Sequence, residues 1–245
     1  MAPILNLSNV SKRFGGLRAV KGVSFAMNEG EILFIIGPNG AGKTTVFNLI
    51  SGFLHPDEGS IVFQGKDISR MPPHSTARLG IGRTFQIVKP LPSLTVLQNV
   101  MLGSFMHAPS PRKAQEEAWK ILDFLQMSPV KDLQARGLPL AALKRLEIAR
   151  ALATRPKLIL LDEVVSGVTT GEALALAELI KRLPEWGVSV VGGVEHVMQV
   201  VMKISDRVVV LDYGAKIAQG DPAEVVKNPA VIEAYLGAKY KELAG

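Results

Sequence analysis

The chain has 245 residues, enough for one large α/β domain or two small lobes around a sizeable core. Hydrophobic residues make up 47% and charged residues 20%, which is typical of a folded globular protein and excludes a disordered chain. There is no cysteine, so disulfides and thiolate metal sites are excluded, and the four histidines lack metal-binding spacing. The net charge of +6 permits contact with nucleic acid or an anionic membrane, but the basic residues are scattered, which favours a solvated surface and a membrane face.

Two absences in the sequence bear on localisation. No run reaches the roughly 18 to 20 uninterrupted apolar residues that a transmembrane helix needs. The N-terminus, MAPILNLSNVSKRF, lacks the basic, apolar and small-residue order of a secretory signal. We therefore expect a cytoplasmic protein.

The first third of the chain predicts short strands and glycine-rich turns. Strands are expected over 4–10, 17–27 and 30–37, and the last of these is apolar enough to be buried on both faces. A helix is expected over 44–54, and a strand and turn over 59–68. Pro72 and Pro73 are expected to break the chain before GRTFQ closes this section.

The remainder predicts a helical lobe and then a return to alternating strands and helices. Helical periodicity marks 95–106 and 113–127, with the loop HAPSPR between them. The expected helices and strands that follow are 141–154, 157–163, 171–183, 188–196, 197–204 and a strand pair at 206–220, with tail helices from Asp221 onward. This order predicts an α/β fold with a mainly parallel sheet, an N-terminal antiparallel β portion and an inserted helical subdomain. We expect 1–86 and 137–222 to form the α/β core, 87–136 the helical subdomain and 223–245 the C-terminal helical tail.

The stretch GPNGAGKTT has the pattern G-x-x-x-x-G-K-[ST] and lies between a buried strand and a helix, which is the setting that a phosphate-binding loop requires. Its glycines allow backbone N–H groups to turn inward on a polyphosphate at the positive end of the helix. The predicted nucleotide-binding residues of this P-loop NTPase core are Gly37, Pro38, Asn39, Gly40, Ala41, Gly42, Lys43, Thr44 and Thr45. Lys43 is expected to neutralise the β- and γ-phosphates of ATP, and Thr44 to bind Mg²⁺.

Two carboxylates follow the apolar strand LILL. At the carboxyl edge of a parallel sheet, Asp162 can hold the Mg²⁺ shell and Glu163 can act as general base toward water. The alternative is an acidic strand end that only faces solvent. Gln86 ends the first section, where its amide can reach the metal or the water and its backbone can move with the helical lobe. His196 follows another buried strand and can hydrogen-bond the γ-phosphate, although a lone histidine is more often a core or surface residue.

The segment LPLAALKRLEIAR predicts an amphipathic basic helix with an apolar lead-in where a polar cap is expected. The order of GPNGAGKTT, GRTFQ, LPLAALKRLEIARAL, LILLDE and VEH resembles the ATP-binding subunits of ABC transporters over nearly the whole chain. In that family the helix-initiating stretch reads L-S-G-G-Q, and it aligns with Leu138, Pro139, Leu140, Ala141 and Ala142. The segments FGGLRAVKGVSF, PSLTVLQNVMLG and RLEIARALATRPKLILLDE are similar to the ATPases of branched-chain amino-acid importers.

The resemblance implies specific roles and partners. It implies that Phe14 stacks on adenine, where the alternative is a core phenylalanine, and that Gln86 and His196 are the lobe-coupling and γ-phosphate residues. It also implies integral membrane permease subunits, a second ATPase subunit with a heterodimer favoured over a homodimer, and indirect action with an extracytoplasmic solute-binding protein. Nucleic acid is not expected as a partner, and the expected location is the cytoplasmic face of the membrane.

The chain departs from the family pattern at two places. Proline supplies neither hydroxyl nor N–H at position 139, and Leu140 adds bulk where a glycine N–H of the usual signature reaches the partner's γ-phosphate. The loop VVSGVT after Glu163 replaces a proline and ends in Thr169 where the family has aspartate or asparagine. These changes predict a weakened signature and asymmetric ATP sites. A regulatory subunit with low turnover and a non-transport ATPase acting on nucleic acid are the alternatives, and the transported solute stays open.

Overall fold

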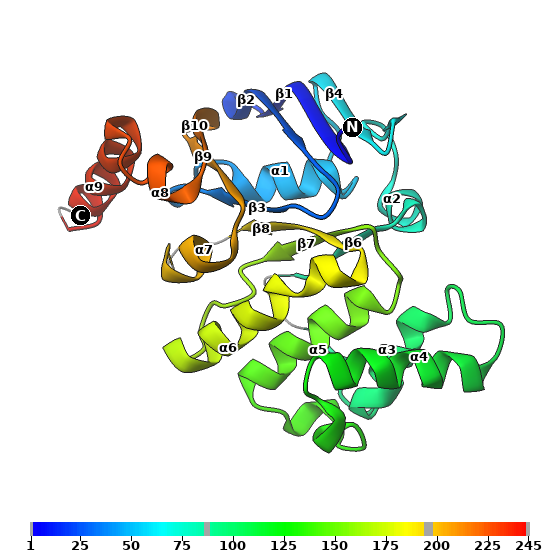
Figure 1. Cartoon of the computed structure of the whole chain (residues 1–245). Helices are drawn as coiled ribbons and strands as arrows, with labels where there is room; N and C mark the ends of the chain where they lie inside the picture. Colours follow the sequence, from blue (N-terminus) through cyan, green and yellow to red (C-terminus); the bar gives the residue numbers. More distant parts are fainter. Residues whose placement is uncertain (1, 86–88, 194–197, 244–245) are drawn as a thin grey trace.

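The computed structural model describes residues 2–85, 89–193 and 198–243. Two β-sheets and a group of helices form successive layers (Figure 1). The first sheet is antiparallel with strand order β2-β1-β4-β5. Its strands are β1 Leu5–Phe14, β2 Leu17–Met27, β4 Glu58–Phe63 and β5 Lys66–Asp67. The predicted N-terminal antiparallel portion is therefore confirmed.

The second sheet has strand order β10-β9-β3-β8-β7-β6 and is parallel except for the β9–β10 hairpin. Its strands are β3 Ile32–Ile36, β6 Ile81–Arg83, β7 Leu158–Asp162, β8 Ser189–Gly193, β9 Arg207–Asp212 and β10 Ala215–Gly220. Successive residues of β3 alternate between two cores: Leu33 and Ile35 face one, and Ile32, Phe34 and Ile36 the other. Burial on both faces explains the continuous apolar runs of the sequence.

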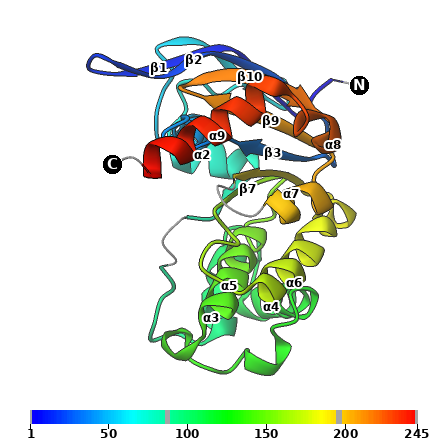
Figure 2. The same ribbon diagram turned by 90° about the vertical axis from the view of Figure 1, so that its left-hand side faces the viewer.

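Helix α1 (Lys43–Ile50) lies between the two sheets and packs its apolar face into the same core as Leu33 and Ile35 (Figure 1). The other face of the parallel sheet is covered by α3 Val96–Ser104, α4 Pro111–Phe124, α5 Leu140–Leu152 and α6 Thr170–Lys181, which lie in the lower half of Figure 2. The 3₁₀ turns Ser128–Val130, Ala135–Gly137 and Leu183–Trp186 accompany these helices.

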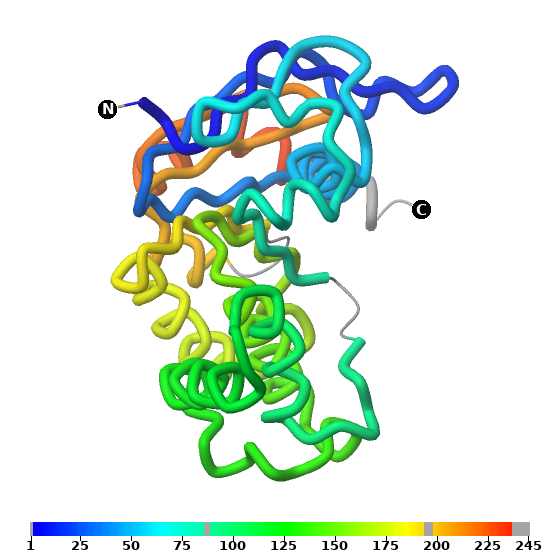
Figure 3. Tube along the Cα trace, turned by 90° about the vertical axis from the view of Figure 1, so that its right-hand side faces the viewer, coloured from blue at the N-terminus to red at the C-terminus, as the bar shows by residue number. Residues whose placement is uncertain are grey.

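The C-terminal part of the described chain adds further helices. They are α7 Met198–Ile204, α8 Pro222–Val225 and α9 Pro229–Leu243. Both chain ends lie in the half of the molecule that holds the sheets, away from the helical half (Figure 3). Helices α3 and α4 lie between β6 and β7 in the chain.

Two local expectations were wrong or incomplete. A short helix, α2 Pro73–Leu79, follows the proline pair, because Pro73 occupies the first helical turn, where its missing N–H costs nothing. The predicted amphipathic character of α5 is wrong, because its charged residues Lys144 and Glu147 are buried, with 3% and 7% of their surface exposed. The spacing of apolar residues could not predict the burial of these charged residues, because α5 is covered by helices on one side and by the sheet on the other.

Candidate nucleotide-binding site

The phosphate loop joins β3 to α1 through a backbone that only glycine allows. Gly37 has φ 149° and Gly42 has φ 101°. A Cβ at Gly37 would lie 2.0 Å from the carbonyl oxygen of Leu211, and one at Gly42 would lie 2.5 Å from that of Ala19. The loop is thus pressed against the ends of β9 and β2 with no room for a side chain.

Helix α1 begins directly after this loop and carries no side-chain cap within the described part of the chain. Its first N–H groups therefore point into the loop, as in other anion-binding helix starts. Lys43 is only 7% exposed, and its Nζ donates to the carbonyl oxygens of Gly37 at 2.7 Å and Pro38 at 2.9 Å. A buried ammonium group and a helix start lie together, which favours a polyphosphate at this place.

A cavity of about 350 Å³ opens beside the loop and has an aromatic wall. Phe14, at the end of β1, lines it opposite the residues Gly40 to Thr45 of the loop. Phe14 is 46% exposed, so it is not a core phenylalanine. Tyr213, in the β9–β10 turn, lines the same cavity and was not expected from the sequence. The cavity has a size suited to a small ligand and joins an aromatic surface to the phosphate loop.

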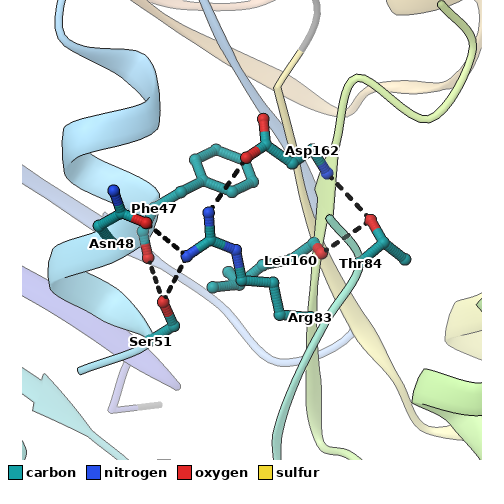
Figure 4. Close-up of polar contacts among 7 residues, drawn as sticks. All are labelled: Phe47, Asn48, Ser51, Arg83, Thr84, Leu160 and Asp162. Carbon is teal, nitrogen blue, oxygen red and sulfur yellow. Dashed lines mark hydrogen bonds and ion pairs between the residues drawn. The ribbon is translucent and has the colours of Figure 1, made fainter. Parts of the chain in front are cut away.

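The two predicted carboxylates lie at the carboxyl end of β7. Asp162 is the last residue of the strand, and its side chain is 9% exposed. Its Oδ2 accepts from Nη2 of Arg83 at 3.1 Å, and its backbone N–H donates to Oγ1 of Thr84 at 3.1 Å (Figure 4). A cavity of about 520 Å³ is lined by both Asp162 and Thr44, so the two predicted metal-binding oxygens face one space.

Glu163 directly follows Asp162 with φ 48°, in the left-handed region. Its backbone N–H donates to the carbonyl oxygen of Gly193 at the end of β8, at 3.0 Å. Its carbonyl oxygen accepts from Nζ of the buried Lys144 at 3.0 Å. A non-glycine residue in this region costs about 1 to 3 kcal/mol and persists where its surroundings fix it. Here the fixing contacts come from β8 and from α5.

Gln86 and His196 lie outside the described residues, so their predicted roles stay predictions. Phe85 and Lys89, on either side of residues 86–88, are described. Burial raises the pKa of Glu147 of α5 and the backbone N–H groups of both residues lower it, so its carboxylate lies near them. Arg150, one turn further along α5, donates from Nη1 to the carbonyl oxygen of Lys89 at 2.8 Å. Helix α5 therefore lies beside the chain on both sides of residues 86–88.

The predicted signature residues occupy the start of α5. Pro139 is the N-cap residue with φ −66° and ψ 160°, and no side chain bonds to the first turn within the described residues. Leu138 is buried, whereas Leu140 is 43% exposed. A Cβ added at Gly167, in the loop after Glu163, would lie 3.1 Å from Cδ2 of Leu140. The two places where the chain departs from the family pattern are thus in contact with each other.

Three residues of this region were missed in the sequence: Arg83, Lys144 and Glu147. Each is a charged residue within one of the motif segments GRTFQ and LPLAALKRLEIAR. No local sequence pattern shows that its side chain is buried. Only the three-dimensional arrangement brings Arg83 to Asp162 and places α5 beside the ends of β6 and β7.

No described helix is both long and apolar enough to cross a membrane. No group of three or more His, Asp or Glu side chains within the described ranges could hold a metal ion by itself. A magnesium ion bound with nucleotide needs only one or two protein groups, because phosphate oxygens and water complete its shell.

The fold and the site together define a P-loop ATPase cassette. Residues 20–166 match the family model described as ABC transporter, and residues 215–241 match the model described as branched-chain amino acid ATP-binding cassette transporter. The chain belongs to the ABC transporter family, and it is an ATPase of the kind that is coupled to transport. The alternative hypotheses, a regulatory subunit with low turnover and an ATPase acting on nucleic acid, are not favoured.

Similar proteins cover nearly the whole chain. A probable branched-chain amino acid transport ATP-binding protein, LivG, of Archaeoglobus fulgidus is 40% identical over 98% of this chain and 98% of its own length. The high-affinity branched-chain amino acid transport ATP-binding protein BraF of Pseudomonas aeruginosa is 39% identical over 96% of this chain and 98% of its own. The solved ADP conformation of an ATP-binding cassette of an ABC transporter is 36% identical with a TM-score of 0.88, covering 97% of this chain and 100% of its own.

The charge of Glu147 gives a first prediction. Burial raises the pKa of Glu147 above its ordinary value of 4.5, and Lys144 and Arg150 oppose the shift. A carboxyl group with a raised pKa in the folded state loses stabilisation as the pH rises from its unfolded pKa through its folded one. Glu147→Gln keeps an acceptor oxygen without the charge. We therefore expect the free energy of unfolding of Glu147→Gln to increase relative to that of the native chain as the pH rises from about 4.5 toward neutrality. Urea unfolding of both proteins at each pH measures this difference.

Glu178→Gln is the matched control. Glu178 lies on the exposed side of α6, and its ion pair with Lys203 lowers its pKa. The stabilising contribution of Glu178 is present at neutral pH and lost in acid, so this variant should show a difference of the opposite sign. A flat pH dependence for Glu147→Gln would contradict the burial argument.

Proposed function

We propose that this chain is the ATP-hydrolysing subunit of an importer for branched-chain or related amino acids, bound to permease subunits at the cytoplasmic face of the membrane. The observation that supports ATP hydrolysis best is that the phosphate loop lines two cavities, one with Phe14 of the antiparallel sheet and one with Asp162, which directly precedes Glu163. The solute class and the direction of transport rest on the names of the relatives.

The nucleotide contacts follow from the two cavities. Phe14 offers its exposed ring to adenine, and the N–H groups of 40–45 surround the phosphates. Base stacking on an aromatic side chain contributes about 1 to 3 kcal/mol. On nucleotide binding, Lys43 exchanges its bonds to the carbonyls of Gly37 and Pro38 for bonds to phosphate oxygens. The loop is thus built before the ligand arrives, and little ordering is left to oppose binding.

A magnesium ion fits the same site. Thr44 supplies a hydroxyl and Asp162 a carboxylate, both hard oxygen donors, and both face the cavity of about 520 Å³. When bound, Mg²⁺ offsets phosphate charge as the leaving group departs. Thr44 and Asp162 would hold it, and Gln86 is the third proposed contact.

Water activation is assigned to the residue after Asp162. Glu163 follows the strand end, so its carboxylate can accept a proton from water that attacks the γ-phosphate, while His196 and Lys43 stabilise the phosphate charge. The fixed left-handed backbone of Glu163 sets the direction in which this side chain leaves the strand. Catalysis then depends on positioning and electrostatics rather than on a covalent step.

The general-base role is tested with Glu163→Gln. The amide keeps the size of the side chain but cannot accept the proton, so turnover of the assembled transporter should fall by about a hundredfold or more. ATP affinity, measured by calorimetry, should stay within about twofold, because the phosphate loop is unchanged. Glu185→Gln, an exposed acid of the 3₁₀ turn, is the control and should change neither value. Near-native turnover of Glu163→Gln would remove Glu163 from this role.

We also propose that the chain pairs with a second, different ATPase subunit. A related cassette, 27% identical with a TM-score of 0.79 and covering 89% of this chain, is a dimer bound to ADP and Pi. In the family arrangement each ATP lies between the phosphate loop of one chain and the signature of the other. The start of α5 has no serine hydroxyl to offer the partner's phosphate, and exposed Leu140 stands where a small residue is needed. The site on this chain's own phosphate loop keeps its residues.

Restoring the signature tests the asymmetry. The triple variant Pro139→Ser, Leu140→Gly, Ala141→Gly should raise the turnover of the chain alone by about tenfold or more, since one lost donor to a transition-state oxyanion costs about 10² to 10³. Adding Glu163→Gln to the triple variant should abolish the gain, which shows that the gain comes from hydrolysis at the sites. Equal turnover of the native chain alone and of the mixture with its partner subunit would contradict asymmetry.

A groove at the junction of the sheets and the helical layer suits a permease segment. A cavity of about 480 Å³ is lined by Phe53, by Phe85 and by Leu102 of α3, and all three side chains are 43% to 52% exposed. Exposed aromatic and aliphatic groups around a hollow mark protein docking sites more often than chance surface. Arg83 and Thr84, which precede Gln86 in the chain, also line the groove. A permease helix seated here would contact both layers at once.

Leu102→Glu tests the docking groove. A charge inside the groove should abolish co-purification with the permease subunits, while the ATP affinity of the isolated chain stays within about twofold, because buried unpaired charges are costly at interfaces. Leu133→Glu is the matched control: Leu133 is 54% exposed in the same helical lobe but does not line the groove. Equal co-purification of both variants would place the permease elsewhere.

A further inference from the structure

Arg83 connects three parts of the nucleotide site through one side chain (Figure 4). Its Nη1 donates to Oδ1 of Asn48 at 2.7 Å and to Oγ of Ser51 at 2.8 Å, at the end of α1. Its Nη2 donates to Oδ2 of Asp162 at 3.1 Å. The helix that starts at the phosphate loop and the carboxylate at the end of β7 are therefore joined by a single planar group.

The guanidinium is enclosed. The side chains of Arg83 and Asp162 are 8% and 9% exposed. Aromatic rings surround the charge, with centroids 6.0 Å away in Phe47, 5.5 Å in Phe53 and 5.3 Å in Phe85. Burial lowers the pKa of Arg83 and the nearby Asp162 raises it, and the group stays charged at neutral pH because an arginine is effectively always protonated.

Stability alone does not account for this arrangement. Moving a charge into the interior costs several kcal/mol, and a buried ion pair usually stabilises a protein no more than apolar residues of the same size. What the pair does supply is direction, because a planar guanidinium with fixed donors holds an acceptor at a set angle. Figure 4 shows the second oxygen of Asp162 directed away from Arg83.

The strand that carries Arg83 strengthens the connection. The next residue, Thr84, donates its N–H to the carbonyl oxygen of Leu160 at 2.9 Å, and its Oγ1 accepts from the backbone N–H of Asp162. The side chain of Asp162 is thus bonded to Arg83, the last residue of β6, and its backbone N–H to Thr84, the residue after the strand. Those residues stand directly before the segment of Gln86.

We propose that Arg83 is a positioning residue for the magnesium site. Its guanidinium fixes the position of the Asp162 carboxylate relative to α1, the helix that follows the phosphate loop. Arg83 bonds to Oδ2 of Asp162, and Oδ1 would be the oxygen that Asp162 offers to the metal. The inference rests on the proposed role of Asp162 in binding Mg²⁺. It assigns to Arg83 no contact with the nucleotide and no proton transfer.

The test compares ATP affinity with Mg²⁺ and with EDTA, by calorimetry on the purified full chain. The ratio of the two dissociation constants is the gain that Mg²⁺ provides. In Arg83→Gln this gain should fall by about 10- to 100-fold, the usual effect of losing an outer-shell partner of a metal ligand. The affinity in EDTA should stay within about twofold, because the phosphate loop is intact. Competition between Arg83 and the metal predicts the opposite result, a larger gain.

Further variants separate positioning from folding. Arg83→Lys keeps the charge but cannot reach α1 and Asp162 together, so its Mg²⁺ gain should also fall, by less than in Arg83→Gln. Ser51→Ala removes one bond on α1 and should cause a smaller loss than either. If Arg83→Gln does not fold, the lysine and serine variants decide alone. An unchanged or increased gain in folded Arg83→Lys overturns the proposal.

Asp162→Asn shows which idea has failed. If Mg²⁺ provides no gain even in the native chain, or the gain survives in Asp162→Asn, the proposed metal role of Asp162 is wrong. If the gain is lost in Asp162→Asn but kept in both Arg83 variants, the metal role stands and only the role of Arg83 is wrong.

Discussion

Burial on both faces of β3, β7 and β8 is the constraint that orders the rest of this molecule. All residues of these strands are buried, so polar chemistry can begin only where the strands end. Because the strands are parallel, their carboxyl ends meet at one edge, and the phosphate loop and Asp162 are found there. The antiparallel sheet adds Phe14 from the other layer, with α1 between the two.

Charged residues of α5 reach the loops of the candidate nucleotide site. Lys144 donates to the carbonyl oxygen of Glu163, and Arg150 donates to that of Lys89. The carboxylate of Glu147 lies near the backbone N–H groups of Phe85 and Lys89. A shift of α5 along its axis would therefore disturb both loops together. Rigid packing supports this coupling, since Gly103 of α3 leaves no room for a Cβ against Arg150 and Ala153.

The sequence predicted the layers and the position of the phosphate loop because these depend on periodicity and on local backbone chemistry. Apolar runs identified β3 and β7, and the spacing of glycines with Lys43 identified the loop. The interior of α5 could not be predicted in the same way, because a buried lysine and glutamate look like an exposed polar face. Arg83 could not be assigned either, since its partners Asn48 and Asp162 are 35 and 79 residues away in the chain. The functional roles of the site residues, and the domain limits, stay predictions.

The position of Leu140 relative to the two cavities bears on the proposed asymmetry of the ATP sites. The residues proposed to hold this chain's own nucleotide lie on β1, the phosphate loop and the end of β7. The start of α5 contributes to none of those cavities, and its Leu140 packs on the loop that follows Glu163. Lys43 and Asp162 keep their hydrogen bonds in a chain whose signature positions are Pro139 and Leu140. In the proposed pairing, Pro139 and Leu140 face the neighbouring subunit's ATP, so a weakened signature affects that site rather than the one on this chain's own phosphate loop.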